Sequence, residues 1–165
     1  EHLEALLALA KREGMEKCYV HAFMDGRDTD PKSGLGFVRQ VEEKMNSGAL
    51  AGTVASLVGR YYAMDRDKRW ERVREAYDLL VKGKGTAYTN AEDAVATSYD
   101  EGVTDEFMKP HVRVDVQGRP VGRIQSGDAV IFINFRNDRA KELTTVLTQA
   151  EIEGMKPLDL FFDAL

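Results

Sequence analysis

The stretch KCYVHAFMDGRDTD, residues 17–30, joins an apolar segment directly to a loop rich in charge. Residues 17–25 have the length and composition of a strand that is buried on both faces. Before them, leucine and alanine recur at helical spacing through residues 1–13, and Gly14 ends the pattern. A helix that leads into a buried strand is the repeating unit of an α/β sheet. This stretch therefore predicts an α/β domain.

Later segments extend the alternation of helices and strands. Apolar residues spaced three and four positions apart predict helices near 35–46 and 70–81. Thr89 and Glu92 have the spacing of a capping box, which predicts a short helix after them.

Three more segments read as strands. The apolar runs at 51–64 and 127–135 have strand length, and residues 112–124 alternate apolar with polar side chains around a QGRP turn, which is typical of a hairpin. We therefore predict a three-layer α/β/α fold with a mixed, largely parallel sheet and one antiparallel hairpin.

Composition limits the class of protein. The 165 residues carry a formal net charge of −5, which argues against a nucleic-acid-binding module because phosphate backbones are bound by broad positive surfaces. The longest apolar run falls short of the roughly 20 residues that cross a bilayer. Cys18 is the single cysteine, so the chain has no disulfide framework, and we expect a reducing cytoplasm. We expect neither nucleic acid nor membrane as a partner.

Arginines follow three of the predicted strands. In open α/β sheets, ligands bind beyond the carboxyl ends of the strands, so these loops should meet at one edge. The guanidinium group matches the oxygens of carboxylate and phosphate in pairs, which suits a small polyanion. Alternatively, each arginine forms a surface ion pair of little energetic value. The arginines in these loops are Arg27, Arg60, Arg66, Arg136 and Arg139.

Asp28, next to Arg27, has two possible roles. Its carboxylate could orient Arg27 or Arg60 as a counter-ion, or it could exchange a proton with a substrate hydroxyl group held among the arginines. Spacing alone leaves both roles open.

Three metal or phosphate motifs fail on inspection. A calcium loop counted from Asp28 would place Ser33 at its glycine and Arg39 at its bidentate glutamate. The GKGT sequence at 83–86 lacks the spacing of a phosphate-binding loop, and it reads as the end of a helix. The three histidines are scattered without other ligands at zinc spacing, so we expect no metal site in this chain.

Four strings carry a resemblance to a known family: HAFMDGRDTDP, SLVGRYYAMDRDKRWERV, YDEGVTDEFMKP and GDAVIFINFRNDRAKEL. Together they resemble the inserted, substrate-binding domain of the cofactor-independent phosphoglycerate mutases, in order from residue 1 to about 148. The resemblance implies an isomerase of glycolysis that interconverts 3-phosphoglycerate and 2-phosphoglycerate through a phosphoserine. It also implies a substrate-binding set on this chain, with Asp28 assisting proton transfer at a glycerate hydroxyl group. That set is Arg27, Asp28, Arg60, Arg66, Arg136 and Arg139.

The resemblance also implies what this chain lacks. In the family, the serine nucleophile and two divalent metals, which we expect to be manganese, belong to a phosphatase-like domain of the same polypeptide. Because the chain begins inside a helical pattern, we expect a piece of a longer protein. The resemblance implies that this piece binds substrate but, lacking the serine, does not turn it over. Residues 1–150 should form the domain and 151–165 a linker. The alternative is a stand-alone, non-catalytic binding module for small phosphorylated acids.

Overall fold

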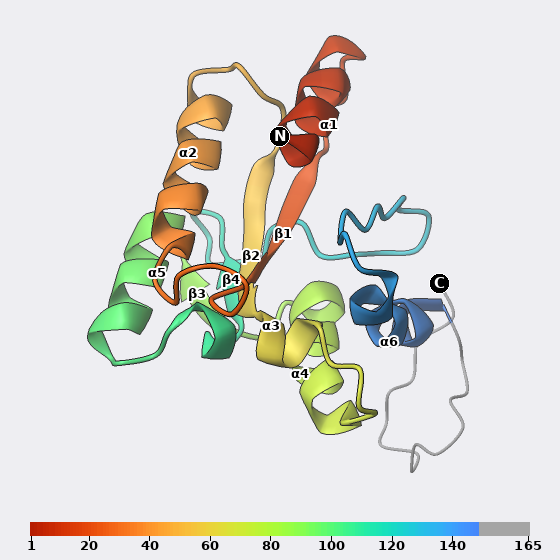
Figure 1. Ribbon diagram of the computed structural model, residues 1–165. Helices are drawn as coiled ribbons and strands as arrows, with labels where there is room; N and C mark the ends of the chain where they lie inside the picture. Colours follow the sequence, from red (N-terminus) through yellow and green to blue (C-terminus); the bar gives the residue numbers. More distant parts are fainter. Residues whose placement is uncertain (149–165) are drawn as a thin grey trace.

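The computed structural model describes residues 1–148 and shows a four-stranded sheet flanked by helices (Figure 1). Across the sheet the order is β1-β2-β4-β3, in which β1 and β2 are parallel, β3 and β4 are parallel, and β2 and β4 are antiparallel. The mixed sheet of the prediction is therefore confirmed. The strands are β1 (Tyr19–Met24), β2 (Thr53–Gly59), β3 (Thr86–Tyr88) and β4 (His111–Arg113).

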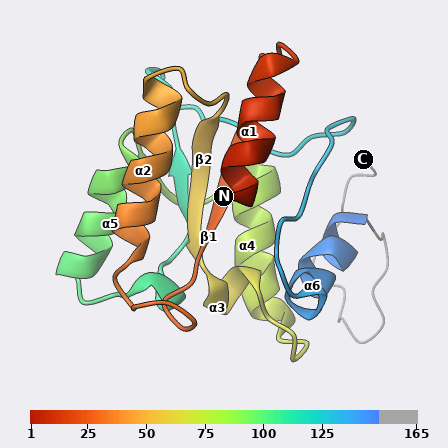
Figure 2. The same cartoon turned by 45° about the horizontal axis from the view of Figure 1, so that its top comes forward.

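Helices form the outer layers, with α2 and α5 over one face of the sheet and α4 and α6 over the other (Figures 1 and 2). Strand β2 contributes to both cores, because Leu57 packs with the α2 and α5 side, whereas Val58 packs with the α4 and α6 side. The three-layer prediction is thus confirmed. The helices are α1 (His2–Arg12), α2 (Gly34–Asn46), α3 (Arg60–Ala63), α4 (Trp70–Lys82), α5 (Ala91–Asp100), the 3-10 helix η1 (Asp105–Phe107) and α6 (Asn137–Thr148).

Strands β1 and β2 end level with each other. Their pairing runs from Tyr19 opposite Thr53 to Met24 opposite Gly59, with one irregularity after Val20 that leaves Ala55 as an extra residue in β2. The parallel register therefore brings the loops that follow the two strands to the same edge of the sheet. Strand β1 lies at the side of the sheet and is only partly buried, with Tyr19 43% exposed, so the prediction of burial on both of its faces is wrong.

Residues 127–135, predicted as a strand, form none. Within the described chain this segment has no ladder partner, and Ile131 and Phe135 are 71% and 101% exposed, although Phe132 packs against the core. An apolar run shows a tendency toward burial, but a strand also requires a neighbour with free hydrogen-bonding groups, and the pattern carries no information on that neighbour.

The predicted hairpin is shorter than expected. A single antiparallel bridge joins Val114 to Pro120, and Asp115 donates its backbone N–H to Arg119 across the turn. The residues before the bridge, 111–113, pair instead with β2 and β3. The 51–64 run likewise divides into β2 and the short helix α3.

Helix ends follow local chemistry. Gly83 adopts the left-handed conformation that ends α4, as the predicted helix stop requires. Helix α5 is capped by Asn90 and not by Thr89: the Asn90 side chain accepts the backbone N–H groups of Glu92 and Asp93. In the part of the chain that the structure describes, every helix is too short or too polar to cross a membrane.

Candidate functional site

The loop after β1 is organised by Asp25. Its Oδ1 oxygen accepts the backbone N–H groups of Arg27 and Asp28, both at 3.2 Å, so the loop folds back over the end of the strand. Gly26 has a φ of +63°, and a Cβ atom there would lie 2.9 Å from the Cβ of Asp105. The loop conformation therefore depends on a glycine that both adopts a left-handed backbone and allows close approach.

Asp105 of η1 anchors the other side of this loop. Its carboxylate accepts the backbone N–H of Gly34 at 2.8 Å and the hydroxyl group of Tyr99 at 2.5 Å, and its own N–H donates to Pro31. Burial and the hydrogen bond to Asp105 raise the pKa of Tyr99. Asp105 is 1% exposed, so its contacts hold the β1 loop against η1 from within the protein.

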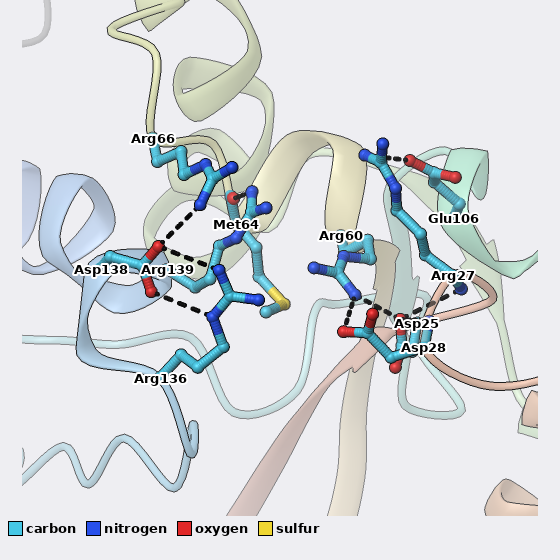
Figure 3. Close-up of polar contacts among 10 residues, drawn as sticks. All are labelled: Asp25, Arg27, Asp28, Arg60, Met64, Arg66, Glu106, Arg136, Asp138 and Arg139. Carbon is cyan, nitrogen blue, oxygen red and sulfur yellow. Dashed lines mark hydrogen bonds and ion pairs between the residues drawn. The ribbon is translucent and has the colours of Figure 1, made fainter.

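Arg60 lies at the end of β2 and is 5% exposed. Its Nη1 donates to Asp25 at 2.5 Å and to Asp28 at 2.8 Å (Figure 3). Burial opposes the charge on Arg60, but the hydrogen bonds to Asp28 and Asp25 outweigh it and raise the pKa of the guanidinium group. Arg60 is therefore a fixed cation shared by two carboxylates.

A second group of arginines lies beside α6. Arg66 and Arg136 both contact the carboxylate of Asp138, at 3.1 and 3.4 Å, and Arg139 donates to the carbonyl oxygen of Met64 at 3.0 Å (Figure 3). The Nε of Arg139 is buried and has no hydrogen-bond partner. The carboxylate of Asp138 therefore pairs with both Arg66 and Arg136, whereas Arg139 contacts a neutral carbonyl oxygen and no carboxylate in this group.

Members of both groups line a common space. Arg27, Arg60 and Arg139 line one polar cavity of about 60 Å³, and Glu106, which pairs with Arg27 at 3.4 Å, also lines it. Burial, followed by repulsion from Arg66, Arg60 and Arg136, lowers the pKa of Arg139. The repulsion at Arg139 thus comes from two arginines that follow β2 and from Arg136 of its own segment. The cavity itself is lined by one arginine or more from each of the three predicted loops, which is the convergence that the sequence predicts.

The predicted site residues differ in their position relative to the cavity. Arg66 and Arg136 surround Asp138 and do not line the cavity, and the Asp28 side chain is 66% exposed while it contacts Arg60. The structure thus places Asp28 as a partner of Arg60, and its exposed carboxylate remains accessible to a ligand.

Sequence reasoning missed several residues of the site. Arg69 and Arg72 also line the cavity. Asp105 holds the β1 loop, and Asp138 pairs with Arg66 and Arg136 beside the cavity. Arg69 and Arg72 follow Arg66 within a charged run that reads equally well as the exposed start of a helix. The sequence does contain a sign of Asp138's role, because this acid lies between the two arginines of the FRNDR string and so is close enough to pair with one of them.

The described residues contain no group of three or more histidine, cysteine, aspartate or glutamate side chains that could hold a metal ion. Residues 1–148 therefore offer no set of ligands for the divalent metals, which the resemblance assigns to another domain.

Fold and site together define an α/β domain that gathers arginines at the carboxyl edge of two parallel strands. The family model described as BPG-independent PGAM N-terminus matches residues 1–162. The chain belongs to this family, which confirms the resemblance seen in its sequence.

Known relatives agree with this assignment. The chain is 60% identical over 152 residues to the 2,3-bisphosphoglycerate-independent phosphoglycerate mutase of Parabacteroides distasonis, covering 92% of the chain and 29% of that relative. It is 53% identical to the protein of the same name from Myxococcus xanthus, over 93% of the chain and 30% of the relative.

A solved structure is also similar. A crystal structure of Leishmania mexicana phosphoglycerate mutase at low cobalt concentration matches with a TM-score of 0.82 at 32% identity, covering 96% of this chain and 30% of that one. The chain thus spans less than a third of the length of these relatives.

Proposed function

We propose that this chain is the substrate-binding part of a phosphoglycerate mutase and that it holds 3-phosphoglycerate and 2-phosphoglycerate. The observation that carries the proposal is the environment of Arg139, a half-buried arginine whose Nε is buried without a partner and whose pKa is lowered by burial and by three neighbouring arginines. A small polyanion placed among these groups would relieve their repulsion. Membership of the family supplies the identity of that polyanion.

The arginines differ in how readily they can bind a ligand. Arg27 is 63% exposed and its pair with Glu106 is long, so it can turn toward a ligand with little loss. Arg60 is held by two carboxylates and offers its remaining N–H groups from a fixed position. Arg139 presents a buried donor without a partner. We assign phosphate and carboxylate binding to these three, with Arg66 and Arg136 completing the set.

Asp28 would contact a glycerate hydroxyl group. Its carboxylate already accepts a hydrogen bond from Arg60, and its exposed part can accept the proton of an alcohol bound next to that arginine. In this role it orients Arg60 and assists proton transfer in the same complex.

The phosphoryl transfer itself would require a serine supplied by the remainder of the polypeptide. In the first step the substrate oxygen–phosphorus bond breaks as the serine oxygen bonds to phosphorus, and the serine proton is replaced by one on the freed glycerate oxygen. In the second step the other hydroxyl group gives up its proton as it bonds to phosphorus, and the serine oxygen regains a proton. Residues 1–150 would retain the glycerate between the two steps. The predicted linker, residues 151–165, lies outside the described residues, and manganese and a cytoplasmic location stay predictions.

Calorimetric titration of the 165-residue chain with 3-phosphoglycerate at low ionic strength tests the proposal. We expect weak, saturable binding that falls at least tenfold in Arg27→Ala, whose side chain is exposed and so leaves the fold intact. Arg12→Ala, which removes an exposed arginine paired with its neighbour Glu13 on α1, is the matched control and should bind as the unchanged chain does.

In the whole enzyme, Arg139→Ala should lower kcat/KM. The expected loss of transition-state stabilisation is about 2–4 kcal/mol, the scale for losing a desolvated charged donor. Equal titration curves for Arg27→Ala and Arg12→Ala, together with less than a tenfold loss for Arg139→Ala, would refute the proposed site. Binding by the chain with no serine nucleophile in the rest of the polypeptide would instead favour a stand-alone binding module.

A further inference from the structure

Glu142 is a buried carboxyl group that the proposed function leaves unused. It lies on α6, one turn after Arg139, and is 8% exposed. Its Oε1 oxygen accepts the backbone N–H of Lys68 at 2.9 Å, whereas its Oε2 oxygen is buried and accepts no hydrogen bond. An ionised carboxylate would be poorly solvated in this position, but a protonated one could use Oε2 as a donor.

Asp65 supplies the acceptor for that proton. It is 6% exposed, and its Oδ2 oxygen accepts the backbone N–H groups of Asp67 and Arg69 at 3.0 and 2.9 Å. Arg72 of α4 lies 3.7 Å from its Oδ1 oxygen. Asp65 is thus held by backbone donors next to Glu142, where its carboxylate can accept a hydrogen bond from the Glu142 oxygen that has no other partner.

The charges around Glu142 also favour its protonated form. Burial raises its pKa, and so do the neighbouring carboxylates of Asp65 and Asp67, while the N–H of Lys68 works against them. On α6 itself, Asp138 and Arg139 occupy the preceding turn, and Arg72 of α4 faces Asp65.

Three polar side-chain contacts that the structure shows join α6 to residues 64–69, the segment that carries Arg66. One of them is the bond from the N–H of Lys68 to Glu142. The other two are the bond from Arg139 to Met64 and the pair of Arg66 with Asp138. We call these three contacts the α6 clasp. Lys68 has a φ of +57°, a left-handed conformation that a lysine rarely adopts, and its N–H is the group that Glu142 holds.

We propose that Glu142 is a positioning residue: its protonated carboxyl group donates to Asp65, closes the α6 clasp and fixes Arg66 relative to Arg139. The identity of the ligand rests on the proposed function, whereas the α6 clasp itself does not. As pH rises, Glu142 ionises next to Asp65, the two carboxylates repel each other, and the segment separates from α6. The α6 clasp is therefore closed at low pH and opens as the pH passes the raised pKa of Glu142.

Three variants of the chain test this inference. Glu142→Gln retains an oxygen for Lys68 and a donor for Asp65 without ionising, Glu142→Ala removes both contacts, and Glu71→Gln, at an exposed position on α4, is the matched control. The first readout is the backbone amide signal of Lys68 from pH 5 to pH 9, with its hydrogen exchange corrected for the intrinsic base-catalysed rate. The second is the affinity for 3-phosphoglycerate.

In the unchanged chain and in Glu71→Gln, we expect the Lys68 signal to titrate and its corrected exchange to accelerate at least tenfold at high pH. Glu142→Gln should abolish this dependence and keep slow exchange and an affinity within twofold of the low-pH value. Glu142→Ala should exchange at least tenfold faster at every pH and bind at least tenfold more weakly.

A titration in Glu142→Gln like that of the unchanged chain would overturn the inference, as would a flat Lys68 signal in the unchanged chain. The two proposals fail separately. Without any 3-phosphoglycerate binding, the expected amide responses would still support the α6 clasp while refuting the ligand. Normal binding with no amide response would refute the α6 clasp while leaving the ligand in place.

Discussion

Replacing Gly59 with alanine should damage both stability and the site, because this glycine touches backbone on the neighbouring segment. A Cβ atom at Gly59 would lie 2.2 Å from the carbonyl oxygen of Glu106 and 2.7 Å from the backbone nitrogen of Met108. Neither is the flexible end of a side chain, so η1 must move by about 1 Å to restore a normal contact from 2.2 Å. The same shift would weaken the bond from the N–H of Gly59 to the carbonyl of Met108, now 2.7 Å.

Overpacking costs about 1–3 kcal/mol and a lost hydrogen bond about 1 kcal/mol, so we expect Gly59→Ala to lower the free energy of unfolding by about 3 kcal/mol. For a chain of this size that corresponds to about 10 °C in Tm. Because η1 carries Asp105 and Glu106, affinity for 3-phosphoglycerate should also fall at least tenfold.

Denaturant unfolding and calorimetric titration of Gly59→Ala and Gly36→Ala together check this reasoning. Gly36 lies in helix α2, and a Cβ atom there meets nothing within 4 Å. Its replacement should stabilise the protein by about 0.5–1 kcal/mol through the better helix propensity of alanine. If the two variants unfold within 0.5 kcal/mol of each other, the contact between β2 and η1 does not limit the fold as described.

Two further perturbations concern stability. Burial lowers the pKa of His21 to about 4, below its ordinary value, so the unfolded chain takes up a proton first as pH falls. Stability should be unaffected by this group above about pH 6.5 and should decrease by about 3 kcal/mol by pH 4. Unfolding curves of the unchanged chain and of His21→Gln measure the difference, and equal slopes with pH would contradict the assignment. Asn90→Ala should cost about 1 kcal/mol by removing the cap of α5, while Asn90→Ser should recover most of it; equal losses in both would argue against the cap.

Much of the fold was predictable because local and tertiary preferences agree in the helices and in β1 and β2. The apolar spacing of α4 and the glycine that ends it point to the same boundary, Gly83. The capping-box spacing predicts Thr89 as the cap of α5, but the next residue, Asn90, has a side chain that reaches two N–H groups. A spacing rule does not contain that geometry.

The candidate site was predictable to the extent that it depends on strand ends. Arg27 and Arg60 follow parallel strands, so topology alone brings them to one edge. The groups that hold them were not predictable. Asp105 is far from Gly26 in sequence, and its role arises only when η1 packs against the β1 loop. The failure at 127–135 has the same origin, since strand formation there depends on a partner and not on composition.

The extra residue of β2 has a consequence for insertions and deletions. Asp25 and Arg60 each follow directly after the last matched pair, Met24 and Gly59, so their ion pair continues the ladder of the sheet by one step. Because Ala55 lies outside the ladder, its removal would leave the pairs on both sides in register and keep Asp25 next to Arg60. Strand β1 has no such extra residue, so deleting one of its matched residues, such as Val20, would displace Asp25 along the strand by about 3.3 Å and turn its side chain toward the opposite face. A change of length in β1, distant from the cavity and altering no charged residue, would therefore separate Asp25 from Arg60.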